Sequence, residues 1–413
     1  MLNKLDRYLR LIETIEESVQ PQFKAIEQRA LINQARVLNA FRQLYIDETC
    51  FFESTGYGYN DLGREKLDQL YAAVFGAEAG LVRPHFVSGT HAIATSLYGI
   101  LKPGDRLLSL TGKPYDTLQK ALGLTKPLFG TLADLGITYD EADFTAGVVE
   151  EELDRLLSQP AQVVLLQRSR GYAQRPSLRI EDIAALVKAV KARQPEAVIF
   201  LDNCYGEFVQ TEEPCHVGVD LCAGSLIKNP GAGIAPSGGY VVGRADLVEK
   251  VAWRLTAPGL GSELGAMGHY KRLYYQGLFL APHQVGQALK GIVLAAALFQ
   301  HLGFRVSPTA DELRADIVQA ICLGEPELLQ QFCRAVQAAS PIDSFVVPEA
   351  APMAGYQDKI IMAAGTFVQG ASSEFSADGP LRPPYEVYLQ GGLTYEHQKI
   401  ALAEILSHLG LPF

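Results

Sequence analysis

The sequence predicts an α/β fold built on a largely parallel sheet, followed by a second, smaller domain. Between about residues 49 and 285, helical stretches alternate with short apolar runs bounded by turn residues. Such runs predict strands at 106–110, 162–167, 197–202 and 240–243. An amphipathic stretch at 181–194 predicts a helix between two of these strands. This alternation implies parallel strands that are covered by helices on both faces of the sheet.

The flanking segments have a different pattern. Residues 1–48 predict a helical arm, because leucine and isoleucine recur at helical spacing, and Pro21 is expected to break this arm in two. We therefore expect three parts: the arm (1–48), a large domain (49–285) and a smaller α+β domain (286–413). The last part opens with a predicted helix at 286–303, and two of its segments, 359–364 and 385–390, predict strands.

Composition excludes several classes of function. The 413-residue chain carries a net charge of −10 and has a pI of about 5.4, which argues against nucleic acid as the main partner. Its six cysteines show neither CxxC nor metal-binding spacing, so we expect free thiols and no metal site. No apolar run has the length of a membrane span, and the N-terminus lacks the apolar region of a secretory signal. The expected location is the cytoplasm.

Two loops in the first half of the large domain carry candidate binding residues. Ser88-Gly89-Thr90 precedes a helical run, and exposed amides at a helix start can bind an anion. An ordinary turn is the alternative for this segment. Tyr115 lies in the loop after the strand at 106–110, where its ring could stack on a planar ligand or simply pack at the loop.

Two further candidates follow in chain order. Asp202 closes the buried strand at 197–202, where its carboxylate needs a partner such as a protonated ring nitrogen or a helix N-terminus. Lys228 stands before the glycine-rich stretch NPGAG, with Ser225 three residues earlier. A lysine in an apolar setting can lose its proton and form an imine with a carbonyl group. Pyridoxal phosphate needs such an amine, an acid for its ring nitrogen, an aromatic ring and a phosphate site.

At this point the sequence resembles the fold-type I pyridoxal-phosphate enzymes, and within them the Cys/Met metabolism group of cystathionine lyases and methionine gamma-lyase. The resemblance covers residues 53–245 in continuous order, through YGYNDLGRE, SGTHAI, KPYDTL, LDNCYGEF and SLIKN. It is closest to the branch called methionine gamma-lyase family or aluminium resistance protein, which shares VSGTHAI, RSRGYAQRPSL and RPPYEVYLQGGLTYEHQK. It implies a large domain with a mainly parallel, seven-stranded type of sheet between helices.

The resemblance also implies roles for single residues. Lys228 would hold the cofactor as an imine and later move a proton. Asp202 would pair with the pyridine nitrogen, and Tyr115 would stack on the ring. The remaining cofactor contacts would be the amides of Gly89 and Thr90, the hydroxyl of Ser225, and Tyr57.

Two expected site residues come from outside the large domain of the same chain. Tyr57 would come from the neighbouring subunit, which implies a homodimer or homotetramer whose active sites are shared between subunits. Arg382 is our candidate for binding the substrate carboxylate, although a loop arginine exposed to solvent is the alternative.

This chain departs from the group at three places. Ile227 stands where a hydroxyl residue usually precedes the lysine, and Tyr59 stands where the group often has an arginine. His91 and Arg64 are candidates to supply the missing phosphate contacts. The segment 167–178 replaces an asparagine-bearing turn, which leaves the roles of four of its residues open. These four are Ser169, Arg170, Tyr172 and Arg175.

The function expected from the resemblance is that of a carbon–sulfur lyase. It would abstract the α proton of a sulfur-containing amino acid resembling cystathionine or methionine and eliminate a thiol from the β or γ carbon. Another pyridoxal-phosphate enzyme, such as an aminotransferase or a decarboxylase, and a non-catalytic pyridoxal-phosphate-binding protein are the alternatives. A nicotinamide dehydrogenase is disfavoured, because no GxGxxG lies between a strand and a helix.

Overall fold

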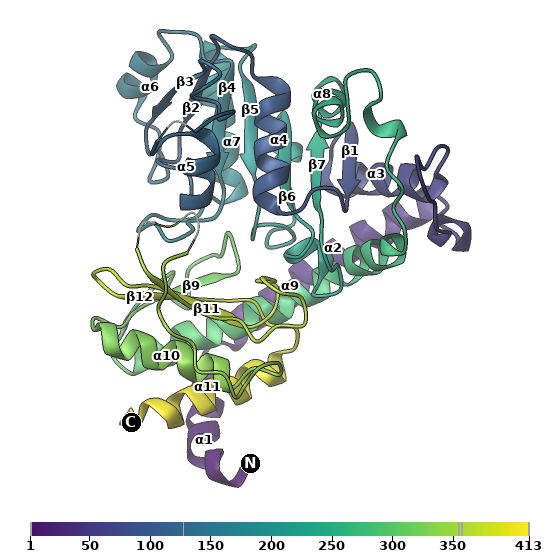
Figure 1. Cartoon of the computed structure of the whole chain (residues 1–413). Coiled ribbons are helices and arrows are strands. Elements are labelled where there is room, and N and C mark those ends of the chain that lie inside the picture. The colour runs from purple at the N-terminus through teal and green to yellow at the C-terminus, as the bar shows by residue number, and fades with distance from the viewer. Residues whose placement is uncertain (1, 127, 354–355, 357, 412–413) are drawn as a thin grey trace.

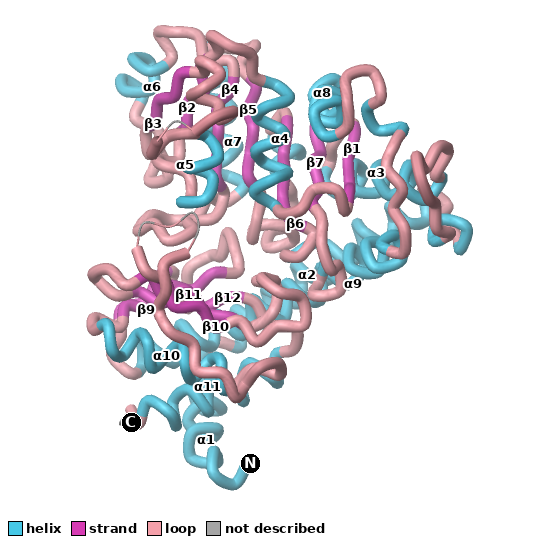
Figure 2. Tube along the Cα trace, in the orientation of Figure 1, coloured by secondary structure: helices cyan, strands magenta, loops and turns pink. Residues whose placement is uncertain are grey.

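The structure, a computed structural model, describes residues 2–126, 128–353, 356 and 358–411. Two sheets lie one above the other and are joined by a long helix, α9 (Tyr270–His301) (Figure 1). Helix, strand and loop segments are distinguished in Figure 2.

The larger sheet has seven strands in the order β1-β7-β6-β5-β4-β2-β3. Their bounds are β1 Ala79–Arg83, β2 Arg106–Ser109, β3 Thr138–Glu141, β4 Val163–Gln167, β5 Val198–Asp202, β6 Leu221–Ser225 and β7 Gly239–Gly243. The strands β3, β2, β4, β5 and β6, in sheet order, run parallel to one another. Strand β7 pairs antiparallel with both β6 and β1. The expected α/β fold with a largely parallel sheet is therefore confirmed.

Helices cover both faces of this sheet. Alternate residues along a strand point to opposite faces, so all of these strands except the edge strand β3 contribute to two apolar clusters. One face packs against α4 (Gly89–Ile100), α5 (Asp116–Leu122) and α8 (Ala245–Leu255). The other face packs against α3 (Leu62–Phe75), α6 (Glu150–Leu156) and α7 (Ile180–Arg193). The predicted strands and the predicted helix at 181–194 agree with β2, β4, β5, β7 and α7 to within one residue at most ends.

The second sheet is antiparallel, with the order β10-β11-β12-β9-β8. Its strands are β8 Arg305–Ser307, β9 Val318–Cys322, β10 Ile360–Ala363, β11 Ser376–Pro380 and β12 Glu386–Gln390. Helices α10 (Pro326–Ala338) and α11 (Tyr395–Leu409) complete this part of the molecule. The N-terminal helices are α1 (Leu2–Ser18), which packs against α11, and α2 (Gln20–Gln43), which packs along α9.

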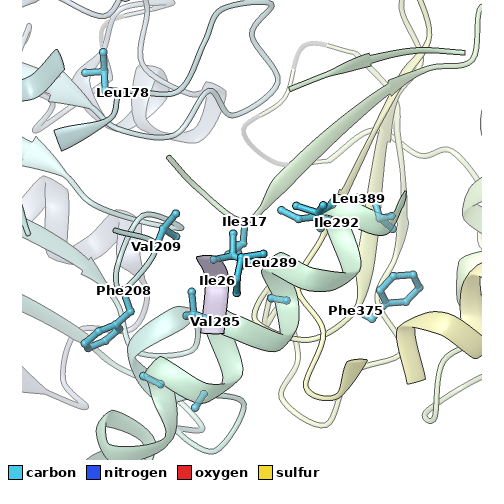
Figure 3. Packing of buried hydrophobic residues seen from close by; sticks show 14 of the residues in the cluster. Ile26, Leu178, Phe208, Val209, Val285, Leu289, Ile292, Ile317, Phe375 and Leu389 are labelled. Atoms are coloured by element: carbon cyan, nitrogen blue, oxygen red, sulfur yellow. The ribbon is translucent and has the colours of Figure 1, made fainter. Parts of the chain in front are cut away.

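Helix α9 begins well before the predicted helix at 286–303, so that boundary was wrong. Pro282 lies inside the helix and Gly277 lies in the same helix before it, and both residues disfavour helix when judged from sequence alone. Tertiary packing overrides this preference. A Cβ at Gly277 would stand 2.7 Å from the carbonyl oxygen of Gly231, so the glycine lets α9 press against the turn that follows Lys228. Figure 3 shows Val285, Leu289 and Ile292 of the same helix packing near Ile26 and Ile317.

Candidate active site

A cavity of about 440 Å³ lies at the carboxyl ends of the parallel strands, between the two sheets. This volume is within the range of pockets that bind small molecules. Side chains from both sheets and their loops line it. They include Thr90, Lys113, Tyr115, Asp116, Gln167, Ser169, Arg170, Tyr172, Asp202, Cys204, Tyr205, Lys228, Tyr356 and Arg382.

The strand register explains why distant residues meet here. Gln167 and Asp202 are the last residues of β4 and β5, and they are direct partners in the ladder. Ser225 ends the next strand, β6, and Lys228 follows it by three residues. Parallel neighbouring strands end at the same edge of a sheet, which brings these side chains to one place.

Lys228 is half-buried in this cavity, and its Nζ lies 4.0 Å from the centre of the Tyr205 ring. Burial lowers the pKa of Lys228, but the neighbouring groups of Cys204, Tyr205 and Asp202 raise it, and the net direction is upward. The amine is therefore held as a cation until a ligand changes its surroundings.

Asp202 is 3% exposed, and its Oδ1 accepts a hydrogen bond from the backbone N–H of Cys204 at 3.0 Å. Burial raises the pKa of this carboxyl, while the Lys228 cation opposes the shift. A cationic or protonated nitrogen placed beside this carboxyl group would stabilise its charged form.

The start of α4 lies beside these residues. The Ser88 hydroxyl accepts from the backbone N–H of His91 at 3.1 Å and caps the helix. A Cβ at Gly89 would stand 3.0 Å from the Cβ of Ser225, so the glycine allows the helix start to approach the end of β6. Thr90 lines the cavity, whereas Gly89 and Ser225 are buried beside it and are not among the lining residues.

Tyr115 connects the helix start to the strand ends. Its hydroxyl donates to Thr90 Oγ1 at 2.9 Å, and its backbone N–H donates to the side-chain oxygen of Gln167 at 3.0 Å. Burial raises the pKa of Tyr115 well above its usual value, so the phenol remains a donor at neutral pH. The ring therefore has a fixed place on the cavity wall.

Arg382, two residues after β11, reaches the same cavity from the side of the antiparallel sheet. Its Nη1 pairs with Asp358 Oδ2 at 3.1 Å, and its Nη2 donates to the backbone oxygen of Tyr172 at 3.1 Å. The guanidinium is thus partly engaged, and a ligand carboxylate would compete with Asp358.

The four residues of segment 167–178 whose roles were left open differ in their contacts. Arg170 donates to Ser307, and Arg175 donates to the backbone oxygens of Gln167 and Ser169, so both guanidinium groups brace the loop. Ser169 donates to Asp316 at 2.7 Å. Tyr172 presents its ring to the cavity.

Tyr57 lies outside the cavity of its own chain and is 69% exposed. Arg64 does not reach the cavity, because its guanidinium donates to the backbone oxygens of Gly58, Glu263 and Gly265. His91 accepts from the backbone N–H of Val87 through Nδ1 at 3.2 Å. Neither side chain is among the residues lining the cavity.

Sequence reasoning missed several residues of this site. Gln167 had a usable signal, because it ends a predicted strand next to the one that ends in Asp202. Tyr205 had a weaker one, since it follows Asp202 by three residues. Tyr356 gave no signal, because only the tertiary fold brings it to the cavity. The same holds for Asp378, which bonds to the lining residue Tyr172.

The described residues show neither a cluster of His, Cys, Asp and Glu that could hold a metal ion nor a disulfide bond. No helix within these residues combines the length and apolar character needed to cross a bilayer.

Comparison with known proteins extends over nearly the whole chain. The family model for methionine gamma-lyase matches residues 8–410. A crystal structure described as a carbon–sulfur lyase involved in aluminium resistance, from Clostridium novyi, is 47% identical with a TM-score of 0.94, covering 98% of this chain and 97% of that chain. The uncharacterized protein YnbB of Bacillus subtilis is 48% identical, covering 96% of this chain and 94% of its own. The pyridoxal-5'-phosphate-dependent protein YhfS of Escherichia coli shares the fold at 17% identity and a TM-score of 0.60, covering 92% of this chain and 97% of that one.

Proposed function

Because the chain belongs to the methionine gamma-lyase family, we propose that it is a pyridoxal-phosphate-dependent carbon–sulfur lyase acting on a sulfur-containing amino acid. The observation that carries this proposal is the meeting of Lys228, Asp202, Tyr115 and Thr90 around one cavity. An amine, an acid, an aromatic ring and a helix start are the groups that this cofactor needs.

The residues present fit the cofactor in size and in chemistry. The half-buried amine of Lys228 would hold the aldehyde, and the buried carboxyl of Asp202 would pair with the ring nitrogen. The amides at the start of α4, together with Ser225, would bind the phosphate, because unpaired N–H groups at a helix start favour an anion. Bound there, pyridoxal phosphate would supply an electron sink for breaking bonds of an amino acid.

The side chains around it would then divide the remaining work. Lys228 would take the proton from the α carbon of the substrate and return it later, once the bound cofactor has changed its surroundings and the amine is in its neutral form. Arg382 would release Asp358 and pair with the substrate carboxylate instead, which would orient the substrate. Tyr115 would cover one face of the reacting group and exclude water from it. The expected products are a thiol, a keto acid and ammonia.

An exposed loop supports the expectation of an active site shared between subunits. Tyr57 and Tyr59 are 69% and 59% exposed, and their ring centres lie 5.5 Å apart. The loop itself is held firmly, since buried Arg64 donates to the backbone oxygen of Gly58 at 2.7 Å. Aromatic side chains presented to solvent by a fixed loop are typical of a surface that another subunit covers. We propose that Tyr57 enters the site of a second copy.

The test of the proposal is to reduce the protein with borohydride after adding pyridoxal phosphate and to locate the modified peptide by mass spectrometry. We expect yellow protein and a pyridoxyl group on Lys228. Lys113, which lines the same cavity, is the matched control. Lys113→Ala should keep the visible absorbance, whereas Lys228→Ala should lose it.

The reaction type is tested separately by product analysis with thioether amino acids. A keto acid with ammonia and thiol supports the lyase. A new amino acid or carbon dioxide would replace it with an aminotransferase or a decarboxylase. Failure of Lys228 to acquire the cofactor would overturn the proposal as a whole.

A further inference from the structure

A carboxyl group of the antiparallel sheet lies next to the cavity, where it is hydrogen-bonded to the lining residue Tyr172. Asp378, on β11, is partly buried. The hydroxyl of Tyr172 donates to its Oδ2 at 2.9 Å, and the side-chain amide of Gln390 donates to the same oxygen at 3.1 Å. Among the described residues, no ion pair includes this carboxyl, and no hydrogen bond reaches its Oδ1.

The charge of Asp378 is not needed for the contacts that it makes. Both donors reach one oxygen, so the side-chain oxygen of an asparagine would serve Tyr172 and Gln390 equally well. Burial raises the pKa of Asp378 to about 6, so the group is a carboxylate at neutral pH. The Lys228 ammonium lowers the pKa of Asp378 without forming an ion pair with it, so a positively charged ligand placed closer would further stabilise the enclosed carboxylate.

Tyrosine rings surround the approach to this carboxylate. The ring centres of Tyr388 and Tyr356 lie 5.1 and 5.9 Å from that of Tyr172. Tyr205 interacts electrostatically with Asp378 from the opposite domain. We call Asp378 with Tyr172, Tyr205, Tyr356 and Tyr388 the acidic cage.

The structure shows that a wall of the acidic cage accepts an ammonium group. Lys228 places its own Nζ 4.0 Å from the centre of the Tyr205 ring, which is a cation–π contact. Tyr205 has a φ of 73°, which a tyrosine rarely adopts, so the surrounding fold imposes the position of this ring. Once Lys228 is bound to a cofactor, its ammonium no longer occupies the face of this ring, and the nearby charge of Asp378 would attract a ligand cation to the same place.

We propose that the acidic cage binds a positively charged group on the sulfur substituent of the substrate. This inference rests on the proposed function, because it assigns the part of the substrate beyond the sulfur atom. Arg382 and Asp378 would then recognise opposite charges at the two ends of the amino acid. The preferred substrate class is a thioether amino acid whose leaving thiol carries an ammonium group.

The test compares two substrates of the same shape, S-aminoethyl-L-cysteine and S-propyl-L-cysteine, with the cofactor-loaded protein. We expect kcat/KM to favour the charged substrate by at least about tenfold, since charged hydrogen bonds are among the stronger ones. Asp378→Asn should abolish this preference while preserving the hydrogen bonds to Tyr172 and Gln390. Asp116→Asn, which removes a charge from the same cavity outside the acidic cage, should keep it.

A binding measurement separates failure of the inference from failure of the proposed function. Calorimetry would compare L-lysine with its isostere in which a methyl group replaces the ammonium, because neither has a thiol to release. Tighter binding of lysine that is lost in Asp378→Asn supports the cage even if no thioether is cleaved. Equal binding of the two ligands to the unaltered protein would overturn it, even if thiol release proves the lyase. Tyr356→Leu gives a second test if the Asp378 variant does not fold, and it too should lose the preference for the cation.

Discussion

Tyr115 provides the most direct test of how the cavity binds its cofactor. The hydroxyl of this tyrosine donates to Thr90 Oγ1, so the hydroxyl proton of Thr90 is left to donate to a ligand. Tyr115→Phe removes that constraint but keeps the ring. The loss of one hydrogen bond is worth about 1 kcal/mol, so we expect pyridoxal phosphate to bind roughly fivefold more weakly.

Tyr115→Ala removes the ring as well. An aromatic ring packed against a planar ligand contributes about 1–3 kcal/mol through buried area and ring contact, so we expect a further loss of about five- to 150-fold. The dissociation constant is measured by titrating cofactor-free protein with pyridoxal phosphate and following the absorbance change.

Tyr98→Phe is the matched control for the hydroxyl. Its phenol also donates at 2.9 Å, to the backbone oxygen of Ala121, and it lies outside the cavity. Tyr98→Phe should lose about as much folding stability as Tyr115→Phe but bind the cofactor as tightly as the unaltered protein. If Tyr115→Ala bound the cofactor no more weakly than Tyr115→Phe, stacking by this ring would be refuted.

The remaining predictions concern charge and assembly. The preference for a cationic ligand should be complete at pH 8 and disappear as the pH falls through about 6, the pKa to which burial raises Asp378, which calorimetry of the lysine pair at several pH values would show. Burial raises the pKa of Glu207 from 4.5 to about 8, so the folded state keeps a proton that the unfolded state loses, and stability should fall with rising pH in this range. Urea unfolding at pH 6 and 8 should show a decrease of about 2 kcal/mol that Glu207→Gln removes; an unchanged decrease would contradict the assignment. Tyr59→Glu should reduce the oligomer observed by light scattering, whereas Phe345→Glu, a change at an exposed ring on the small-domain side, should not; a stable oligomer in both variants would exclude the Tyr57 loop as its interface.

The large sheet was predictable from sequence because its strands are short apolar runs with clear ends. Once β5 was placed, the position of Asp202 at the carboxyl edge followed from parallel topology alone. The start of α9 was not predictable in this way. Its first half contains Gly277 and Pro282, and it is helical because the fold packs it against the turn after Lys228.

The residues on the two sides of the cavity also differ in how clearly the sequence indicates them. Lys228, Asp202 and Tyr115 lie at ends of strands or in the loops that follow them, so local pattern and family resemblance both indicate them. Asp378 lies inside a strand of the antiparallel sheet, where a single acid reads as a solvent-facing residue. Only the position of that sheet beside the cavity reveals that Asp378 lies near Tyr172 and Lys228.

The residues that fit the cofactor and the residues that would select the substrate come from different parts of the fold. The groups that fit the cofactor come from one sheet edge, whose geometry leaves little freedom, and they can serve many reactions of amino acids. Asp378 lies in the antiparallel sheet, and Tyr356 and Arg382 lie in segments next to its strands. This sheet packs against α9. The charge that these residues present can change without disturbing Lys228 or Asp202. We therefore expect Asp378→Asn to redirect substrate choice while leaving the visible absorbance of the bound cofactor unchanged, and a loss of that absorbance would show that the two functions are not separable.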